Sequence, residues 1–203
     1  ATPFTIASGY YGWSSLIKDI NRDGKNDLIM SQLNGSGPKL YQNNYSSGAI
    51  SASSFGSAQT LSGSHSQDGM AIADISGDGT VDVASVNTYI KLSTNLMSAS
   101  QTIGGSNSEF SSINVNSSYA SAQRGILAED FDGDGKVDIL VHNALSSSNT
   151  VSIYENRNGE VVFYPKSTGN LHTTSTWGNN ADGTGTSPTN LTDASTGYKL
   201  ANR

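Results

Sequence analysis

The chain has 203 residues, of which 34% are hydrophobic, and Gly, Ser, Asn and Thr are abundant; this favours short strands and many turns over long amphipathic helices. The formal net charge of −6, with only eleven Lys and Arg, argues against nucleic-acid binding, because phosphate neutralisation needs clusters of basic residues. The absence of cysteine excludes disulfides and thiolate metal sites, and no apolar run reaches the length that membrane insertion as a helix requires.

Three segments of the chain align with one another without gaps. They run from Ser15 to Met30, from Met70 to Ser85 and from Ile126 to Val141. Each contains the nine-residue pattern D-x-[D/N/S]-x-D-G-x-x-D, and its first aspartates stand at positions 19, 74 and 130. A period of about 55 residues is typical of repeat architectures, in which one unit cannot bury its apolar face without a neighbour.

Short apolar runs around these loops predict β-strands, taken here in chain order. The first repeat predicts strands at 16–17, 28–30, 38–43 and 55–61. The second predicts strands at 70–73, 81–84, 89–95 and around 99–103. The third predicts strands before its loop and at 137–141, 150–156 and 160–164. Four short antiparallel strands in about 55 residues is the makeup of a propeller blade.

The order of these features, an apolar strand, the Asp-rich loop, a second apolar strand and a strand that ends in Asn, resembles the FG-GAP/VCBS repeats of integrin-α-like β-propellers. The resemblance covers roughly residues 13–165. It implies an all-β fold of at least three propeller blades, with calcium in each loop on the hairpin between the first two strands. It also implies an extracellular role in adhesion or carbohydrate recognition, or as a module of a secreted enzyme or toxin.

We expect residues 1–166 to form three blades, at about 4–61, 62–120 and 121–166. The polar, Gly/Thr/Asn-rich stretch 167–203 is expected to be either a degenerate fourth blade or a linker. Closure usually takes four to eight blades, so three would leave an incomplete propeller or one closed by further chain. Exposed sheet edges would then favour further blades or self-association.

The three loops offer the oxygen ligands that calcium prefers. Positions 1, 3, 5 and 9 of each loop supply side-chain oxygens, and position 7 supplies a backbone carbonyl. The predicted ligands are Asp19, Asn21, Asp23, Lys25 and Asp27 in the first loop, Asp74, Ser76, Asp78, Thr80 and Asp82 in the second, and Asp130, Asp132, Asp134, Lys136 and Asp138 in the third. We expect about three Ca²⁺ ions, because clustered carboxylates repel one another unless a cation neutralises them. The second loop should bind most weakly, since a serine stands at its position 3.

Two other interpretations of the loops are less consistent with the sequence. An EF-hand needs flanking helices and a bidentate Glu at position 12, where this chain has Met30, Ser85 and Val141. Metal-free turns would explain one such loop, but three copies at matched spacing favour metal binding.

The sequence predicts a binding protein and not an enzyme. The three histidines share no metal-ligand spacing, no G-x-S-x-G motif is present, and only a carboxylate pair outside the loops stays open as a catalytic set. The aromatic residues Tyr10, Tyr11, Trp13 and Trp177 are candidate ligand contacts, with packing between blades as the alternative.

We expect a secreted or surface-displayed, calcium-stabilised adhesion module that recognises a glycan or an extracellular protein. Weak carboxylate loops suit the outside of the cell, where calcium is typically millimolar. The alternatives are a non-catalytic propeller part of a larger secreted enzyme or toxin, and an extracellular structural subunit that associates with its own copies.

Overall fold

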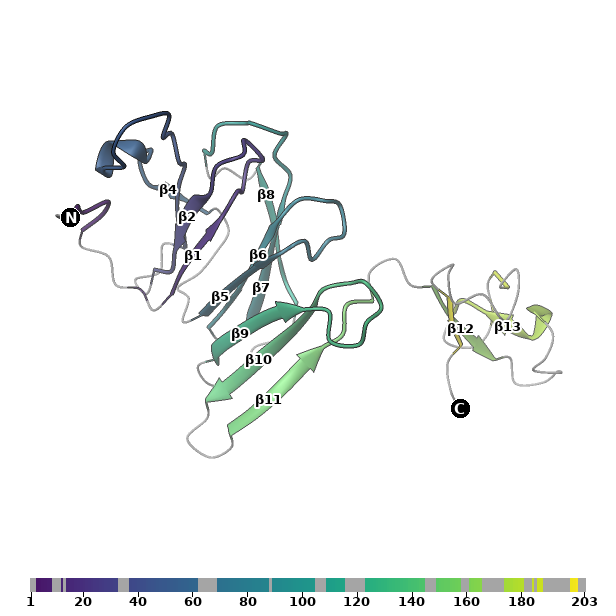
Figure 1. The fold of residues 1–203 in the computed structure, drawn as a ribbon. Helices are drawn as coiled ribbons and strands as arrows, with labels where there is room; N and C mark the ends of the chain where they lie inside the picture. The colour runs from purple at the N-terminus through teal and green to yellow at the C-terminus, as the bar shows by residue number, and fades with distance from the viewer. Residues whose placement is uncertain are drawn as a thin grey trace. The chain divides into compact units, whose positions relative to one another are not determined.

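The structure is a computed structural model of the chain, and the chain divides into two compact units, Ala1–Asn156 and Arg157–Arg203. The described residues are 3–8, 12, 14–32, 37–61, 69–87, 89–104, 109–115, 123–144, 149–157, 161–165, 174–180, 184, 186–187 and 198–200. Figure 1 shows the strands of the first unit as successive small sheets along the chain.

Three antiparallel sheets make up the first unit (Figure 1). The first has the order β1 (Ser15–Lys18), β2 (Asp27–Met30), β3 (Lys39–Tyr41), β4 (Gln59–Thr60). The second has the order β5 (Gly69–Ala73), β6 (Asp82–Val86), β7 (Ile90–Asn95), β8 (Phe110–Asn114). The third contains β9 (Gln123–Glu129), β10 (Asp138–Ala144) and β11 (Asn149–Tyr154), with β10 in the middle. The expected all-β fold of blade-like meanders is therefore confirmed.

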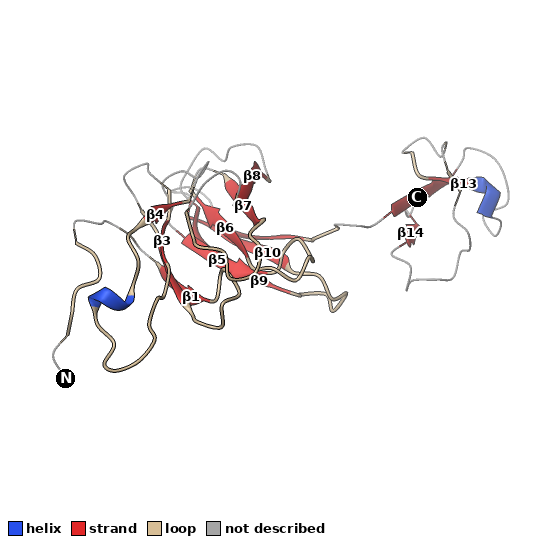
Figure 2. Cartoon of the chain, turned by 90° about the horizontal axis from the view of Figure 1, so that it is seen from above, coloured by secondary structure: helices blue, strands red, loops and turns tan. Residues whose placement is uncertain are grey.

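Helical structure is confined, in the described part of the chain, to two short 3-10 turns (Figure 2). These are η1 (Ala52–Ser54) and η2 (Thr174–Thr176). The composition predicted this outcome, because Gly, Ser, Asn and Thr favour turns over helix interiors.

One predicted fourth strand is wrong, and another exists but belongs to a different sheet. The second sheet uses β8, at Phe110–Asn114, and residues 99–103 form a loop instead. The predicted strand at 160–164 is found as β12 (Val161–Pro165), but it pairs with β13 (Trp177–Gly178) and β14 (Tyr198–Leu200) in the second unit. The boundary between units accordingly falls after Asn156 and not at residue 166. An apolar run predicts that a strand exists, but not the strand with which it pairs.

Neighbouring sheets of the first unit pack face to face and bury an apolar cluster between them. One apolar cluster lies between the first and second sheets: Ile20, Ile29, Leu40, Leu61, Met70, Val83, Met97, Ile103 and Phe110. A second cluster lies between the second and third sheets: Ala71, Ile75, Ala84, Val86, Ile90, Ile126, Ile139 and Val141. This repeated packing explains how short strands that are mostly polar on one side still bury a core.

The outer face of the third sheet differs from the equivalent faces of the other two. In the first sheet, Ile29 and its cross-strand neighbour Leu40 are both fully buried by the second sheet. At the matching positions of the third sheet, Leu140 pairs with Leu127 and Ile153, which are 57% and 55% exposed. We call the exposed apolar residues of this sheet and its loop the open face: Leu127, Phe131, Val151 and Ile153.

This packing predicts a large difference between two isoleucines of the first hairpin. Ile29 is fully buried between sheets, whereas Ile17, on the opposite face, is 68% exposed. Ile29→Ala should lower the free energy of unfolding by about 2–5 kcal/mol through the cavity that it leaves. The matched change Ile17→Ala should stay within about 0.5 kcal/mol. Urea denaturation of both variants, followed by circular dichroism, measures the difference, and equal effects would contradict the sheet-to-sheet packing.

Candidate metal centre

The three Asp-rich loops are the turns of three β-hairpins. They join β1 to β2, β5 to β6 and β9 to β10, and the position-9 aspartate is the first residue of the second strand each time. Position 12 lies inside β2, β6 and β10, not in a helix. The expected hairpin setting is therefore confirmed, and it excludes an EF-hand at these loops.

The position-1 aspartates fold the three loops into one shape. In each loop, one carboxylate oxygen accepts a hydrogen bond of 2.9 Å from the backbone N–H of the position-6 glycine. The other oxygen accepts from the position-5 N–H at 3.1–3.2 Å. The donors and acceptors are Asp19, Asp23 and Gly24, then Asp74, Asp78 and Gly79, then Asp130, Asp134 and Gly135. The loop conformation thus depends on the carboxylate that begins it.

Position 4 of the loop is a structural requirement that the sequence reasoning missed. Its backbone φ angle is positive in all three loops: 58° at Arg22, 77° at Gly77 and 80° at Gly133. The sequence holds one indication, because position 4 is glycine in two of the three loops and glycine adopts this conformation without steric cost. In the first loop the arginine guanidinium donates to the carbonyl of Met97 at 2.6 Å, a contact that holds a non-glycine residue in this region.

The position-9 aspartates, Asp27, Asp82 and Asp138, are the buried members of the motif, at 0%, 0% and 1% exposure. One carboxylate oxygen of each accepts from the position-2 backbone N–H at 3.0–3.1 Å. The other accepts from the backbone N–H of an asparagine at the end of the third strand (Asn95) or two residues beyond it (Asn43 and Asn156), at 2.9, 2.8 and 2.7 Å. These bonds offset part of the cost of burying a carboxylate.

The pKa values of two of these aspartates are shifted upward. Burial raises the pKa of Asp27, the hydrogen bonds from Asn43 and Ile20 partly oppose this, and the nearby charges of Asp23 and Asp19 add to it. Burial likewise raises the pKa of Asp82, against hydrogen bonds from its neighbours. Burial thus disfavours the ionised form of these carboxylates, and a cation bound beside them would stabilise that form.

Three carboxylates converge in the third loop. Asp130, Asp132 and Asp138 each place one oxygen within 4.8 Å of the others, the one such acidic group found in the described residues. In the other loops, position 3 is Asn21 or Ser76, so a neutral oxygen replaces the third carboxylate. An all-oxygen donor set of this kind fits a hard cation such as Ca²⁺.

The remaining predicted ligands have the following places. The position-5 aspartates accept from the position-7 N–H at 2.8–2.9 Å, in the pairs Asp23–Lys25, Asp78–Thr80 and Asp134–Lys136. Ligation by the position-7 carbonyls stays a prediction.

Among the aromatic residues predicted to contact a ligand, Trp177 is 6% exposed in the second unit, which fits packing better than ligand contact. The aromatic residues Tyr10, Tyr11 and Trp13 lie outside the described residues.

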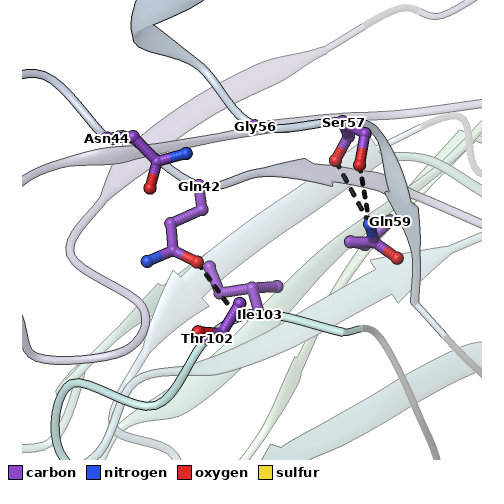
Figure 3. Close-up of a pocket in the computed structure, with 7 residues that line it drawn as sticks. All are labelled: Gln42, Asn44, Gly56, Ser57, Gln59, Thr102 and Ile103. Carbon is purple, nitrogen blue, oxygen red and sulfur yellow. Dashed lines mark hydrogen bonds between the residues drawn. The ribbon is translucent and has the colours of Figure 1, made fainter.

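A polar pocket of about 250 Å³ lies between residues of the first and second repeats (Figure 3). It is lined by Gln42, Asn44, Gly56, Ser57, Gln59, Thr102 and Ile103. Gln42 comes from the first sheet and its side-chain oxygen accepts from the backbone N–H of Ile103 at 3.1 Å, which joins the two walls. The lining carries amides and hydroxyls but no charged side chain.

Taken with the fold, the three equivalent hairpins define a β-repeat with an Asp-rich loop between the first two strands of each unit. Comparison with known families agrees: residues 19–85 match the model of the FG-GAP-like repeat. The match begins at the first aspartate of loop one and ends three residues beyond the last aspartate of loop two, so the chain contains a repeat of this family. The comparison with curated proteins gives no match.

The raised pKa values predict how pH should affect calcium binding. In the metal-free protein, the protonated forms of Asp27 and Asp82 favour the folded state, and this stability is lost as pH rises through their folded pKa values. Calcium requires the ionised forms, so its stabilising effect should be small near pH 4 and complete near pH 7, because an ordinary Asp titrates at about 3.9. The melting temperature in metal-depleted buffer, with and without added calcium at each pH, measures this stabilising effect. An equal calcium effect at both pH values would contradict it.

Proposed function

We propose that this chain is a calcium-stabilised binding or adhesion module that acts outside the cell without catalysing a reaction. The observation that carries the proposal is the match of residues 19–85 to the FG-GAP-like repeat, in a chain whose three hairpin loops share one hydrogen-bond pattern. FG-GAP repeats are typical of extracellular binding proteins. In the described residues, no helix is long and apolar enough to cross a membrane.

The residues that would hold calcium are the acids and polar side chains at positions 1, 3, 5 and 9 of each loop. When bound, the ion would neutralise clustered carboxylates and fix the hairpin turn. The buried position-9 aspartates support this role, because they bring negative charge into the protein beside the turn. A structural ion at each hairpin would hold together a fold whose strands are only a few residues long.

The partner in this proposal is a glycan or an extracellular protein. The pocket of Figure 3 supports a hydroxyl-rich partner, because amides such as those of Gln42 and Gln59 both donate and accept hydrogen bonds. Asn44 lines the same pocket and is exposed, so Asn44→Ala is a suitable variant for comparing glycan-array or protein-capture signals with those of the unmodified chain. Tyr10, Tyr11 and Trp13 remain further candidates for partner contact.

Calcium should raise the melting temperature, and one substitution in each loop should reduce that gain. The variants Asp23→Ala, Asp78→Ala and Asp134→Ala each remove a position-5 carboxylate, none of which is buried. For the unmodified chain, calcium at 100 times its Kd should add about 2.7 kcal/mol per site to the free energy of unfolding. Thermal unfolding at increasing calcium, after chelator treatment and buffer exchange, measures the gain. A melting temperature that does not change with calcium concentration would overturn the proposal.

A second candidate function is that of a subunit that assembles with its own copies. The observation that favours it is the open face. The equivalent positions of the first sheet, such as Ile29 and Leu40, are buried against a following sheet, whereas Leu127 and Ile153 are more than half exposed. A second copy could place its first sheet there, since Ile17 on that sheet's free side is also exposed. Such a head-to-tail contact forms a ring or a filament.

Assembly of this kind predicts a concentration-dependent mass. Leu127→Lys together with Ile153→Lys should return an oligomer to the monomer, because each lysine would be buried without a partner at the contact. Ile50→Lys, at a side chain that is 53% exposed and lies in the first repeat's loop region, is the control and should leave the mass unchanged. Sedimentation at several protein concentrations measures the mass. A monomer at every concentration would exclude this second function.

A further inference from the structure

Two asparagines connect neighbouring metal loops. The backbone N–H of Asn95 donates to Asp82 of its own repeat at 2.9 Å, while its side-chain amide donates to the carbonyl of Ile20 in the preceding repeat at 2.8 Å. Asn156 repeats this arrangement one sheet further on. Its N–H donates to Asp138 at 2.7 Å and its side chain to the carbonyl of Ile75 at 2.7 Å, with a second side-chain bond to the carbonyl of Val137 in its own loop at 3.0 Å. Each asparagine therefore holds a predicted ligand of one loop and the backbone of another.

The carbonyls that these asparagines contact lie within the loops. Ile20 and Ile75 occupy position 2, between the predicted ligands at positions 1 and 3. Their side chains are buried, at 0% and 5% exposure, and Asn95 is 1% exposed. A buried hydrogen bond is costly to leave unmade, so a change in the asparagine's position should be transmitted to the position-2 backbone.

The first loop has further contacts with the second repeat. The side-chain amide of Asn21 donates to the carbonyl of Gln101 at 2.8 Å, and the N–H of Ser100 donates to the carbonyl of Asn21 at 2.6 Å. The Arg22 guanidinium donates to the carbonyl of Met97. Positions 2 to 4 of loop one are thus held, through backbone and side-chain atoms, by Asn95 and by residues 97–101 of the second repeat.

We propose that Asn95 and Asn156 are positioning residues that couple adjacent calcium loops, so that an ion in one loop raises the affinity of the preceding loop. The inference rests on the calcium binding proposed above. An ion at loop two fixes Asp82, Asp82 fixes the backbone of Asn95, and the Asn95 side chain orders position 2 of loop one. Coupling between sites is reciprocal, so loop one should affect loop two by the same factor.

Asn43 is the matched control within the same chain. Its N–H donates to Asp27 at 2.8 Å, as in the other repeats, but its side chain donates to Asn26 of its own loop at 3.0 Å. Asn43→Ala should therefore alter loop one alone, whereas Asn95→Ala should alter loops one and two. The contrast separates coupling from the local support that every strand-end asparagine gives.

The experiment follows each loop separately by the ¹⁵N amide signals of Gly24, Gly79 and Gly135. Each of these N–H groups donates to the position-1 aspartate of its loop at 2.9 Å, so each reports its own site during a calcium titration of the whole chain. Asp78→Ala disables loop two, and in the presence of Asn95 it should raise the calcium midpoint of Gly24 by about fivefold or more. In the Asn95→Ala background, the same change should move that midpoint by less than about twofold, as for independent sites.

The outcomes are distinguishable. Glycine signals that ignore calcium in the unmodified chain would overturn the proposed function itself. The glycine signals could instead respond to calcium while Asp78→Ala leaves the Gly24 midpoint unchanged, or shifts it equally with Asn95 and with Asn95→Ala. Either result would overturn the coupling alone. If Asn95→Ala fails to fold, the half-buried Asn156 gives the same cycle, with Asp134→Ala as the disabling change and Gly79 as the reporter.

Discussion

The structure depends on the burial of one carboxylate in each repeat. Asp27, Asp82 and Asp138 are almost fully buried, and each accepts hydrogen bonds from its own loop and from an asparagine at or just beyond the end of the third strand. One side chain therefore joins three strands that are individually too short to be stable. The same burial raises the pKa of Asp27 and Asp82. The interaction that organises the sheet therefore also disfavours their ionised forms, which a bound cation would stabilise.

Repetition turns this local unit into a stack. The asparagine that donates its backbone N–H to the buried aspartate also reaches the preceding repeat, as Asn95 does toward Ile20. The apolar residues beside this contact complete the cluster between sheets. Hydrogen bonding and apolar packing therefore set the same spacing between neighbouring sheets, and a change at a loop should be felt by the sheet before it.

The loops and hairpins could be predicted from sequence because their chemistry is local. The spacing of Asp19, Asp23 and Asp27 fixes a turn, and the apolar runs beside it fix the strands. What could not be predicted depends on distant partners. The pairing of β12 with β13 and β14, and the use of β8 in the second sheet, follow from tertiary contacts that strand propensity does not encode. The positive φ at Arg22 was hidden for the same reason, since a distant carbonyl, that of Met97, supports it.

Ligand charge and neighbouring support rank the three loops differently. By charge, the third loop is strongest, because Asp132 replaces the neutral side chains of Asn21 and Ser76. By support, the first loop is strongest, since the second repeat holds its backbone and its side chains through several hydrogen bonds. The third loop has the most acids, yet Phe131 at its position 2 is 42% exposed, whereas Ile20 at the same place is fully buried. Affinity in such an array is therefore a property of the stack, and counting carboxylates in one loop does not determine it.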